Sequence, residues 1–258
     1  MKKPQVQALS DFLTEYTKLM LSSGTYTARV SKCVERIAQI YGYEVNINFF
    51  FHHFSINIVD KDDNSINRTY IIPNKHAHLN FKLILDLSAL SWAIYDKKYA
   101  LEDAKKLFYQ ISTQKKHPYA LTLFLVSLGN AAFCRLFGGD FGGFCLVFLG
   151  TLAGLSLRYI LTKIKIDLRI QYVICAFISS WIVFLGVDTN LTKEADVALG
   201  SSILYLIPGV FFINSVIDIL KDHILMGLSR IISVVILVCC IAMGIYATLS
   251  LSNYGILQ

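Results

Sequence analysis

Apolar residues in the first part of the chain recur at spacings of three and four, which indicates one face of a helix. The stripe predicts a helix over residues 6–20, and its members are Leu9, Phe12, Leu13, Tyr16, Leu19 and Met20. A second helix is predicted to begin near residue 25, with Thr25 or Thr27 as its cap, and to stop at Gly42. Both helices are amphipathic and therefore need a core to pack against.

After Gly42 the period changes from that of a helix to that of a strand. Residues 44–49 and 55–59 alternate polar and apolar, with His52-His53 as the turn, and residues 69–72 form a third run ended by Pro73. Two more amphipathic helices are predicted over residues 78–95 and 100–113. Together these elements predict an α+β domain with a small antiparallel sheet.

From Tyr119 onward the polar face disappears and long apolar runs follow one another. Five of them approach the roughly 20 residues that a helix needs to cross a bilayer, namely residues 119–137, 141–161, 170–187, 197–220 and 231–251. The predicted fold is therefore a five-helix transmembrane domain, residues 119–258, preceded by the α+β domain, residues 1–118.

Charge follows the same division. Only 16% of the chain is charged, against about 25% in a typical soluble domain, and 16 of the 24 basic residues precede Tyr119. No apolar leader with a cleavage site opens the chain, so the polar domain is expected in the cytoplasm. The second and fourth connections between the spans are net basic and the third is net acidic, which favours a carboxyl terminus outside.

The fourth apolar run carries Pro208-Gly209 near its middle, and Asn214 and Asp218 one turn apart. Proline removes a helical hydrogen bond, so this span is predicted to kink or break inside the membrane. We interpret the run as a substrate path in which Pro208, Gly209, Asn214 and Ser215 bind substrate and Asp218 carries a proton. Because Asp218 falls near the end of the run, an interfacial position in contact with water is an equal alternative for it. The alternative is an ordinary kinked span whose Asn214 hydrogen-bonds a neighbouring helix.

The first two spans contribute further candidates. Asn130 is a second substrate ligand or a polar packing contact, and Gly150-x-x-x-Gly154 predicts a close helix contact. Arg135 and Asp140, at the ends of these spans, are candidates for an ion pair.

Several function classes find no support. The six cysteines form no CxxC pair, and the histidine pairs at 52–53 and 76/78 lack an accompanying carboxylate or cysteine pattern. Because hydrolase and phosphate-loop motifs are also missing, we predict no enzyme activity, no cofactor and no metal site. No basic patch interleaved with aromatics suggests nucleic acid. A membrane-embedded sensor with a cytoplasmic α+β output domain stays open as an alternative function.

Five segments make the chain resemble the threonine/serine exporter family, specifically its amino-terminal subunit, which includes YjjP-like inner-membrane proteins. They are GTYTARVSKCVERIAQIYG (24–42), the polar domain ending at Pro118, RLFGGD (135–140), LIPGVFFINSVIDIL (206–220) and GLSR (227–230). Relatives commonly carry an acidic residue soon after the Arg-Val pair, where this chain has Ser31. The role of that acid is therefore not carried over.

The resemblance implies a multi-pass protein of the bacterial inner membrane that exports a small amino acid, threonine or serine, or a dicarboxylate such as succinate, driven by the proton gradient. Five spans are few for an alternating-access carrier. We therefore expect a second membrane subunit carrying the other half, with a homo-oligomer as the lesser option, both in contact with lipid. Arg29 and Arg68 are candidates for gathering anionic substrate, although a solvated structural role is the more common one.

Overall fold

The computed structural model describes residues 3–74, 79–114 and 118–253, and they form two compact units. The first unit contains the described residues up to 114 together with Val210–Ile232, and the second contains residues 118–209 together with those from Ser233 onward. The chain therefore enters the first unit twice. The predicted division into a cytoplasmic and a membrane domain remains a prediction.

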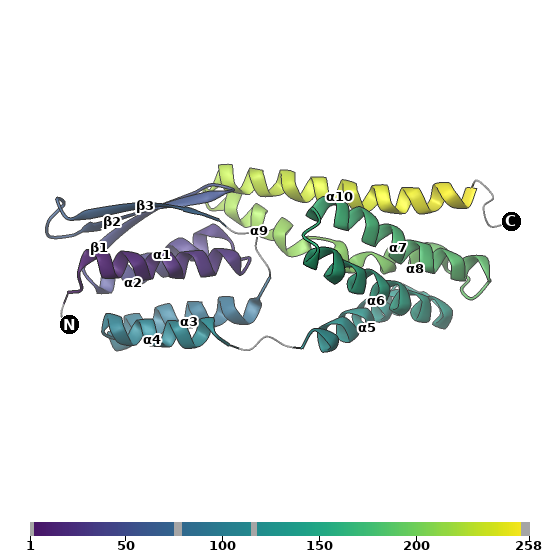
Figure 1. The fold of residues 1–258 in the computed structure, drawn as a ribbon, viewed down its shortest axis with the longest axis horizontal. Coiled ribbons are helices and arrows are strands. Elements are labelled where there is room, and N and C mark those ends of the chain that lie inside the picture. Colours follow the sequence, from purple (N-terminus) through teal and green to yellow (C-terminus); the bar gives the residue numbers. More distant parts are fainter. Residues whose placement is uncertain (1–2, 75–78, 115–117, 254–258) are drawn as a thin grey trace. The chain divides into compact units, whose positions relative to one another are not determined.

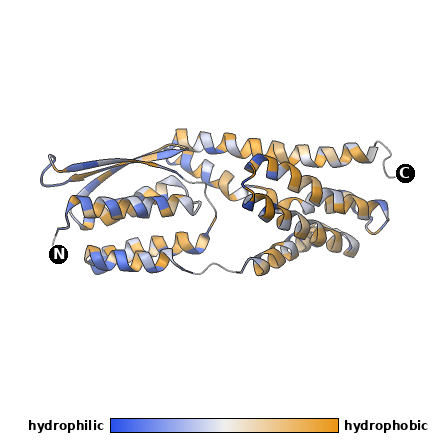
Figure 2. Cartoon of the chain, in the orientation of Figure 1, coloured by the Kyte–Doolittle hydropathy of each residue, from blue (hydrophilic) through white to orange (hydrophobic). Residues whose placement is uncertain are grey.

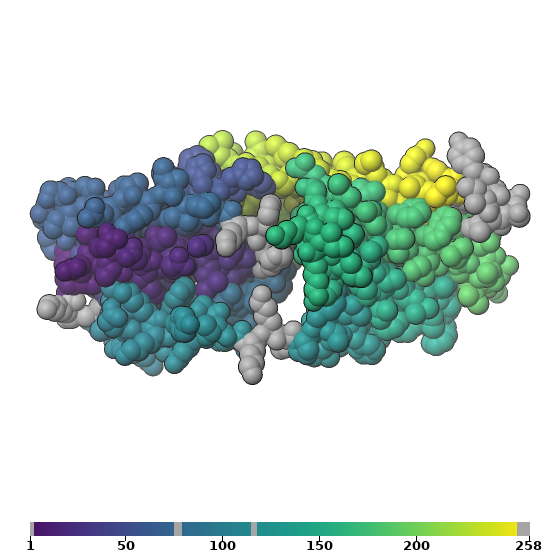
Figure 3. Space-filling view, viewed as in Figure 1, coloured from purple at the N-terminus to yellow at the C-terminus, as the bar shows by residue number. Residues whose placement is uncertain are grey.

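The first unit has three layers (Figures 1 and 3): the sheet, then α1 and α2, then α3 and α4. Its elements are α1 (Val6–Ser22), α2 (Thr27–Ile40), β1 (Tyr43–Phe49), β2 (His53–Asp60), β3 (Asn67–Pro73), α3 (Phe81–Lys97) and α4 (Leu101–Ser112). The strands pair in the order β1-β2-β3, both pairs antiparallel. This confirms the predicted sheet, although His53 lies in β2 and not in the turn.

The apolar periodicities that predicted these elements become the core of the first unit. Leu9, Leu13 and Tyr16 of α1 are fully buried, as are Phe54 and Ile56 on alternate positions of β2. The Tyr16 hydroxyl donates to the Leu87 carbonyl of α3 over 2.7 Å, so the buried phenol is satisfied. The helix predicted over residues 78–95 begins at Phe81 in the structure. The Asn80 side chain caps it by accepting a hydrogen bond from the Leu83 amide. Residue 78, the predicted start, lies outside the described residues.

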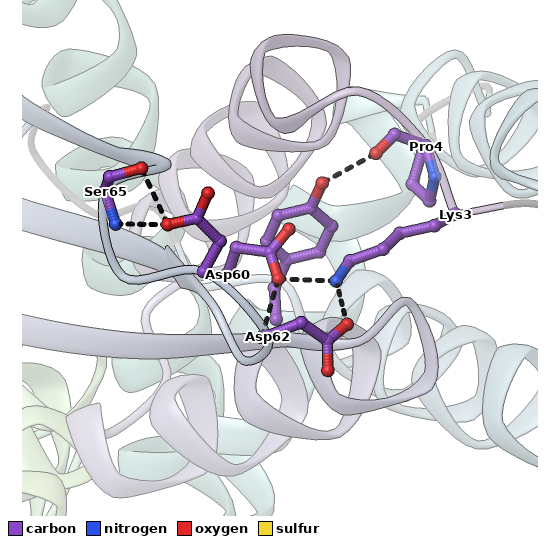
Figure 4. A network of polar contacts seen from close by, with 7 residues as sticks. Lys3, Pro4, Asp60, Asp62 and Ser65 are labelled. Carbon is purple, nitrogen blue, oxygen red and sulfur yellow. Dashed lines mark hydrogen bonds and ion pairs between the residues drawn. The ribbon is translucent and has the colours of Figure 1, made fainter.

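A polar network fastens the segment before α1 to one end of the sheet (Figure 4). Lys3 Nζ lies 2.5 Å from Asp60 Oδ1 and 2.7 Å from Asp62 Oδ2, and the Tyr43 hydroxyl donates to the Pro4 carbonyl. The hydrogen bond from Lys3 is the main cause that lowers the pKa of Asp60. The entry to α1 is thereby held against β1 and β2.

The second unit is built from α5 (Tyr119–Leu136), α6 (Phe141–Lys163), α7 (Leu168–Asp188), α8 (Ala195–Ser202) and the short 3-10 turn η1 (Leu204–Leu206). α9 (Gly209–Leu220) belongs to the first unit except for Gly209, and α10 (Ile224–Asn253) begins in the first unit and ends in the second. Figure 2 shows that the helices from α5 onward are predominantly hydrophobic, whereas hydrophilic residues are frequent on α1 to α4.

Within the described residues, four helices are long and apolar enough to cross a membrane, or five if the bent pair of α8-η1 and α9 counts as one span. The break falls where proline predicted it: Ile207 is extended, with ψ 119°, and α9 starts at Gly209. Pro208 itself is buried. The structure agrees with the five predicted spans only if the broken pair is counted as one span.

The Gly150-x-x-x-Gly154 ridge of α6 lies against α7, as the sequence predicted. A Cβ at Gly150 would stand 2.8 Å from the Ser179 carbonyl oxygen, and one at Gly154 would stand 2.0 Å from the Tyr205 hydroxyl. The Ser179 hydroxyl also donates to the Gly150 carbonyl over 3.0 Å. Gly150 therefore permits a backbone contact with α7 that any side chain would prevent, and Gly154 leaves room for the side chains of Ser179 and Tyr205.

Candidate functional site

The carboxylate of Asp218, on α9, lies at the amino end of α2 within the first unit. Its Oδ1 accepts from the Thr27 amide over 2.7 Å and from the Thr27 hydroxyl over 2.5 Å. The residue is fully buried. A residue 191 positions away in the sequence thus satisfies the first amide of the helix.

α2 needs such a partner because its own sequence supplies none. Its N-cap position is Tyr26, which makes no side-chain cap, and its first turn contains no acidic residue. The partial positive charge of a helix amino terminus favours a carboxylate at this place. The caps predicted at Thr25 or Thr27 are therefore wrong: Thr27 donates to a cap and does not provide one.

The second oxygen of the carboxylate is paired with Arg230 of α10. Arg230 Nη1 lies 2.6 Å from Asp218 Oδ2, and the two side chains are 14% and 0% exposed. Nη2 of the same guanidinium points to the Thr25 carbonyl over 3.4 Å. Asp218 is therefore compensated both by a full positive charge and by a helix terminus, as a buried carboxylate requires.

Asn214 lies one turn before Asp218 and binds the same connection between α1 and α2. Its side-chain amide donates to the Gly24 carbonyl over 2.8 Å. Gly24 adopts φ +84°, a conformation that favours glycine, so this carbonyl is presented by a turn that other residues rarely adopt. Asn214 and Asp218 thus hold residues 24–27 from two neighbouring positions on one face of α9.

α9 and α10 approach closely beside this cluster. A Cβ at Gly227 would stand 2.8 Å from the Ser215 carbonyl oxygen and 2.5 Å from Ile219 Cγ1. Ser215 is fully buried, and its hydroxyl donates to the Phe211 carbonyl of its own helix. The small residue at 227 allows α10 to lie against α9 with Arg230 one turn further along.

The predicted site residues divide between the two units. Asn214, Ser215 and Asp218 lie together in the first unit, whereas Pro208 and Gly209, at the break before α9, belong to the second. Asn130 lies within the second unit, where its amide donates to the Thr151 hydroxyl over 3.2 Å. The substrate and proton roles of these residues remain predictions.

The two arginine candidates, Arg29 and Arg68, differ in their surroundings. The Arg29 guanidinium, in the first turn of α2, lies over the Tyr26 ring at 5.2 Å from its centroid. Arg68 is exposed on β3. Arg29 is thus close in sequence to the capped end of α2, whereas Arg68 stands on the surface of the sheet.

Arg135 and Asp140 take different partners, and the ion pairs of the described residues do not include one between them. Arg135 donates to the Gly139 carbonyl over 2.8 Å. Asp140 caps α6 by accepting from the Gly143 amide, and it also accepts from the Thr192 hydroxyl and the Lys193 amide. These bonds, the one from Thr192 first, lower the pKa of Asp140 to about 2.

The low pKa of Asp140 gives a stability prediction with a definite sign. A carboxyl whose pKa is lower in the folded state stabilises the fold above its unfolded pKa, near 4, and this contribution is lost as the pH falls toward 2. Asp140→Asn is therefore expected to lower the thermal midpoint of the purified protein at pH 7, and the difference from the unsubstituted protein is expected to shrink between pH 4 and pH 2. Melting curves followed by circular dichroism measure this; a difference that does not change with pH would contradict it.

Arg230 was not among the residues that the sequence proposed for the site. The apolar run predicted over residues 231–251 leaves Arg230 just outside the last span, but α10 begins seven residues earlier, at Ile224. The missed signal was GLSR itself, an arginine between two apolar stretches. A basic residue inside an apolar helix usually has a partner, and here it is Asp218.

Metal ligands do not gather in the part of the chain that the structure describes: it contains no group of three or more His, Cys, Asp or Glu side chains placed to hold an ion. His53 instead stacks with Phe50, and His52 contacts the Phe51 ring edge to face, at the tip of the β1-β2 hairpin. The pair at 76 and 78 lies outside the described residues.

A buried ion pair held by apolar helices, together with four or five candidate spans, defines a multi-pass membrane protein. The chain belongs to the family described as "Putative threonine/serine exporter" (ThrE), whose model matches residues 11–252. This confirms the family resemblance found in the sequence.

Two curated relatives carry the name "Probable succinate transporter subunit YjjP". The one from Klebsiella aerogenes is 25% identical over 250 residues, which cover 96% of each chain. The one from Escherichia coli K12 is 23% identical over 252 residues, which cover 96% of this chain and 97% of the relative. No solved structure matches the chain.

The cluster around Asp218 is where three of the segments that carry the family resemblance meet. Thr27 comes from the segment 24–42, Asn214 and Asp218 come from 206–220, and Arg230 ends the segment 227–230. Segments far apart in the chain thus contribute to one buried polar site.

Proposed function

We propose that this chain is one subunit of a secondary exporter for threonine and serine or for a dicarboxylate such as succinate, coupled to protons and working with a second membrane subunit. The observation that carries the proposal is the buried pair of Asp218 and Arg230 on helices of an exporter-family protein. Ionisable residues in apolar helices are costly and are typically found on substrate or proton pathways.

In this proposal Asp218 takes up and releases the coupling proton. It is the acidic residue of α9, and its charge is balanced by one arginine, so protonation changes the bonding of the whole cluster. Asn214, one turn away, contributes a polar group for substrate. Pro208 and Gly209 leave the amino end of α9 free of the preceding helix, and such an end favours a carboxylate.

A second subunit is proposed for two reasons. The relatives are named as a transporter subunit, and four or five spans are few for a carrier that binds substrate between two repeats. α9 and the start of α10 also expose large apolar side chains, among them Ile213, Leu220 and Leu225, which lipid or another chain would cover. A homo-oligomer is the lesser option. We place the complex in the bacterial inner membrane, with the amino-terminal domain in the cytoplasm and the carboxyl terminus outside.

Efflux from proteoliposomes tests this function. Vesicles containing the chain, with and without its proposed second membrane subunit, are preloaded with labelled threonine, serine or succinate and placed under an imposed pH gradient. We expect gradient-dependent efflux that needs both chains. Efflux by a purified monomer would contradict the partner, and no efflux of any of the three from sealed vesicles with both folded proteins would contradict the function.

Two substitutions locate the site in the same assay. Asn214→Ala is expected to lower efflux without loss of protein from the membrane, and Pro208→Ala is expected to change both efflux and stability. Asn57→Ala, which removes a surface amide bonded to Thr69 on the sheet, is the control and is expected to export normally. Normal rates in both site variants would refute the broken-helix site.

A further inference from the structure

The partners of Asp218 together make a complete binding site for a carboxylate. They comprise a guanidinium, a helix amide and a hydroxyl, contributed by Arg230 and Thr27. These donors are the ones that proteins use to bind free carboxylates and phosphates. The group that occupies the site is the protein's own side chain.

Every substrate in the proposed function carries the same chemical group. Threonine and serine have an α-carboxylate, and succinate has two carboxylates. We propose that the substrate carboxylate replaces that of Asp218 on Arg230 and Thr27, and that it does so when Asp218 takes up a proton. This inference rests on the proposed function and names the group by which the substrate is held.

The charges of the site require that one proton is bound for each substrate carboxylate. With Asp218 ionised, the pair of Asp218 and Arg230 is neutral. When a proton binds the Asp218 carboxylate, the guanidinium loses its counter-ion, and a buried unpaired charge is strongly unfavourable. A bound substrate carboxylate restores neutrality, so one proton is taken up with each carboxylate bound and the two leave together when Asp218 returns, which makes efflux fastest when the pH is lower on the side from which the substrate is taken.

The surroundings of the pair favour this exchange. Arg230 keeps 14% of its side chain exposed, whereas Asp218 is fully covered, so Arg230 is the member of the pair that a ligand can reach. The ionisable groups nearest in sequence to the pair are Arg29 in the first turn of α2 and His223 in the turn after α9, whose ring contacts Phe49 of β1. The same elements also carry Lys32, Cys33, Glu35 and Arg36 on α2 and Lys221 and Asp222 after α9. The His223 amide donates to the Asp218 carbonyl and not to its carboxylate.

Direct binding by the full-length protein in nanodiscs tests the exchange, with labelled succinate and threonine as probes at pH 5.5 and pH 8. The unsubstituted protein is expected to bind more tightly at pH 5.5. Asp218→Asn cannot ionise and is expected to bind at least about 100-fold more tightly than the unsubstituted protein at pH 8, without pH dependence, because uptake of one proton changes the affinity about tenfold per pH unit. Adding Arg230→Gln to Asp218→Asn is expected to abolish binding.

Asp140→Asn is the matched control, because Asp140 also caps a helix and accepts from a threonine hydroxyl but pairs with no arginine among the described residues. It is expected to keep the pH dependence of the unsubstituted protein. The inference is overturned if Asp218→Asn keeps that pH dependence, if the double variant binds as Asp218→Asn does, or if neither probe binds at millimolar concentration.

A second measurement needs no variant. Titration calorimetry of the unsubstituted protein in buffers of different ionisation enthalpy counts protons, and we expect uptake of one proton per carboxylate bound. Gradient-driven efflux without proton uptake on binding would overturn the exchange alone. Absence of efflux would count instead against the exporter function.

Discussion

Arg230→Gln is expected to destabilise the first unit by about 3–5 kcal/mol, because it leaves the fully buried carboxylate of Asp218 without its positive partner. The amide and hydroxyl of Thr27 would remain as donors, but neither carries a full charge. Trp92 reports on this unit because it lies under the Arg36 guanidinium at 3.6 Å. Its fluorescence during denaturation, in a Trp181→Phe background, measures the loss.

The double variant Asp218→Asn/Arg230→Gln separates charge from packing. Removing both charges leaves no unpaired ion, so it is expected to recover most of the stability that Arg230→Gln loses. Arg230→Lys is expected to fall between, because lysine keeps the charge but cannot reach the carboxylate and the Thr25 carbonyl with one planar group. A double variant no more stable than Arg230→Gln would show that the ion pair does not determine the effect.

Gly150→Leu is expected to destabilise the second unit by about 3 kcal/mol, since even a Cβ there would stand 2.8 Å from the Ser179 carbonyl of α7. The two helices would have to move apart, and the bond from the Ser179 hydroxyl to the Gly150 carbonyl would be lost. Trp181 lies on α7 and reports on this unit in a Trp92→Phe background.

Gly129→Leu is the matched control for that experiment. Gly129 lies on α5, another apolar helix, but a Cβ there meets nothing within 4 Å. We expect little change in stability from this substitution. Equal losses in the two variants would mean that the apolar bulk of leucine, and not the α6-α7 contact, causes the effect.

The parts of the fold with a local period could be predicted from the sequence. The stripe over Leu9, Leu13 and Tyr16 gave α1, and alternation gave β1 and β2, because each pattern records which side chains face the core. Pro208 gave the break before α9, because its effect on the backbone is local.

The cluster around Asp218 could be predicted only in part. Asn214 and Asp218 stood out as polar residues in an apolar run, but their partners at Gly24 and Thr27 lie about 190 residues away, and no period links such positions. Arg230 was missed because the start of α10 was placed too late. Long-range pairing of this kind is decided by tertiary packing and not by local pattern.

Because the first unit is built from two separate stretches of the chain, it cannot be completed before residue 232 has been synthesised. At about 5–20 residues per second, translation takes about 6–23 s to proceed from residue 114 to Arg230. During that interval the nascent amino-terminal segment lacks Met226 from its core and Asp218 from the end of α2. The segment must therefore persist as an incomplete intermediate on the ribosome while the second unit is being made, and a gene truncated at residue 115 would encode only that intermediate.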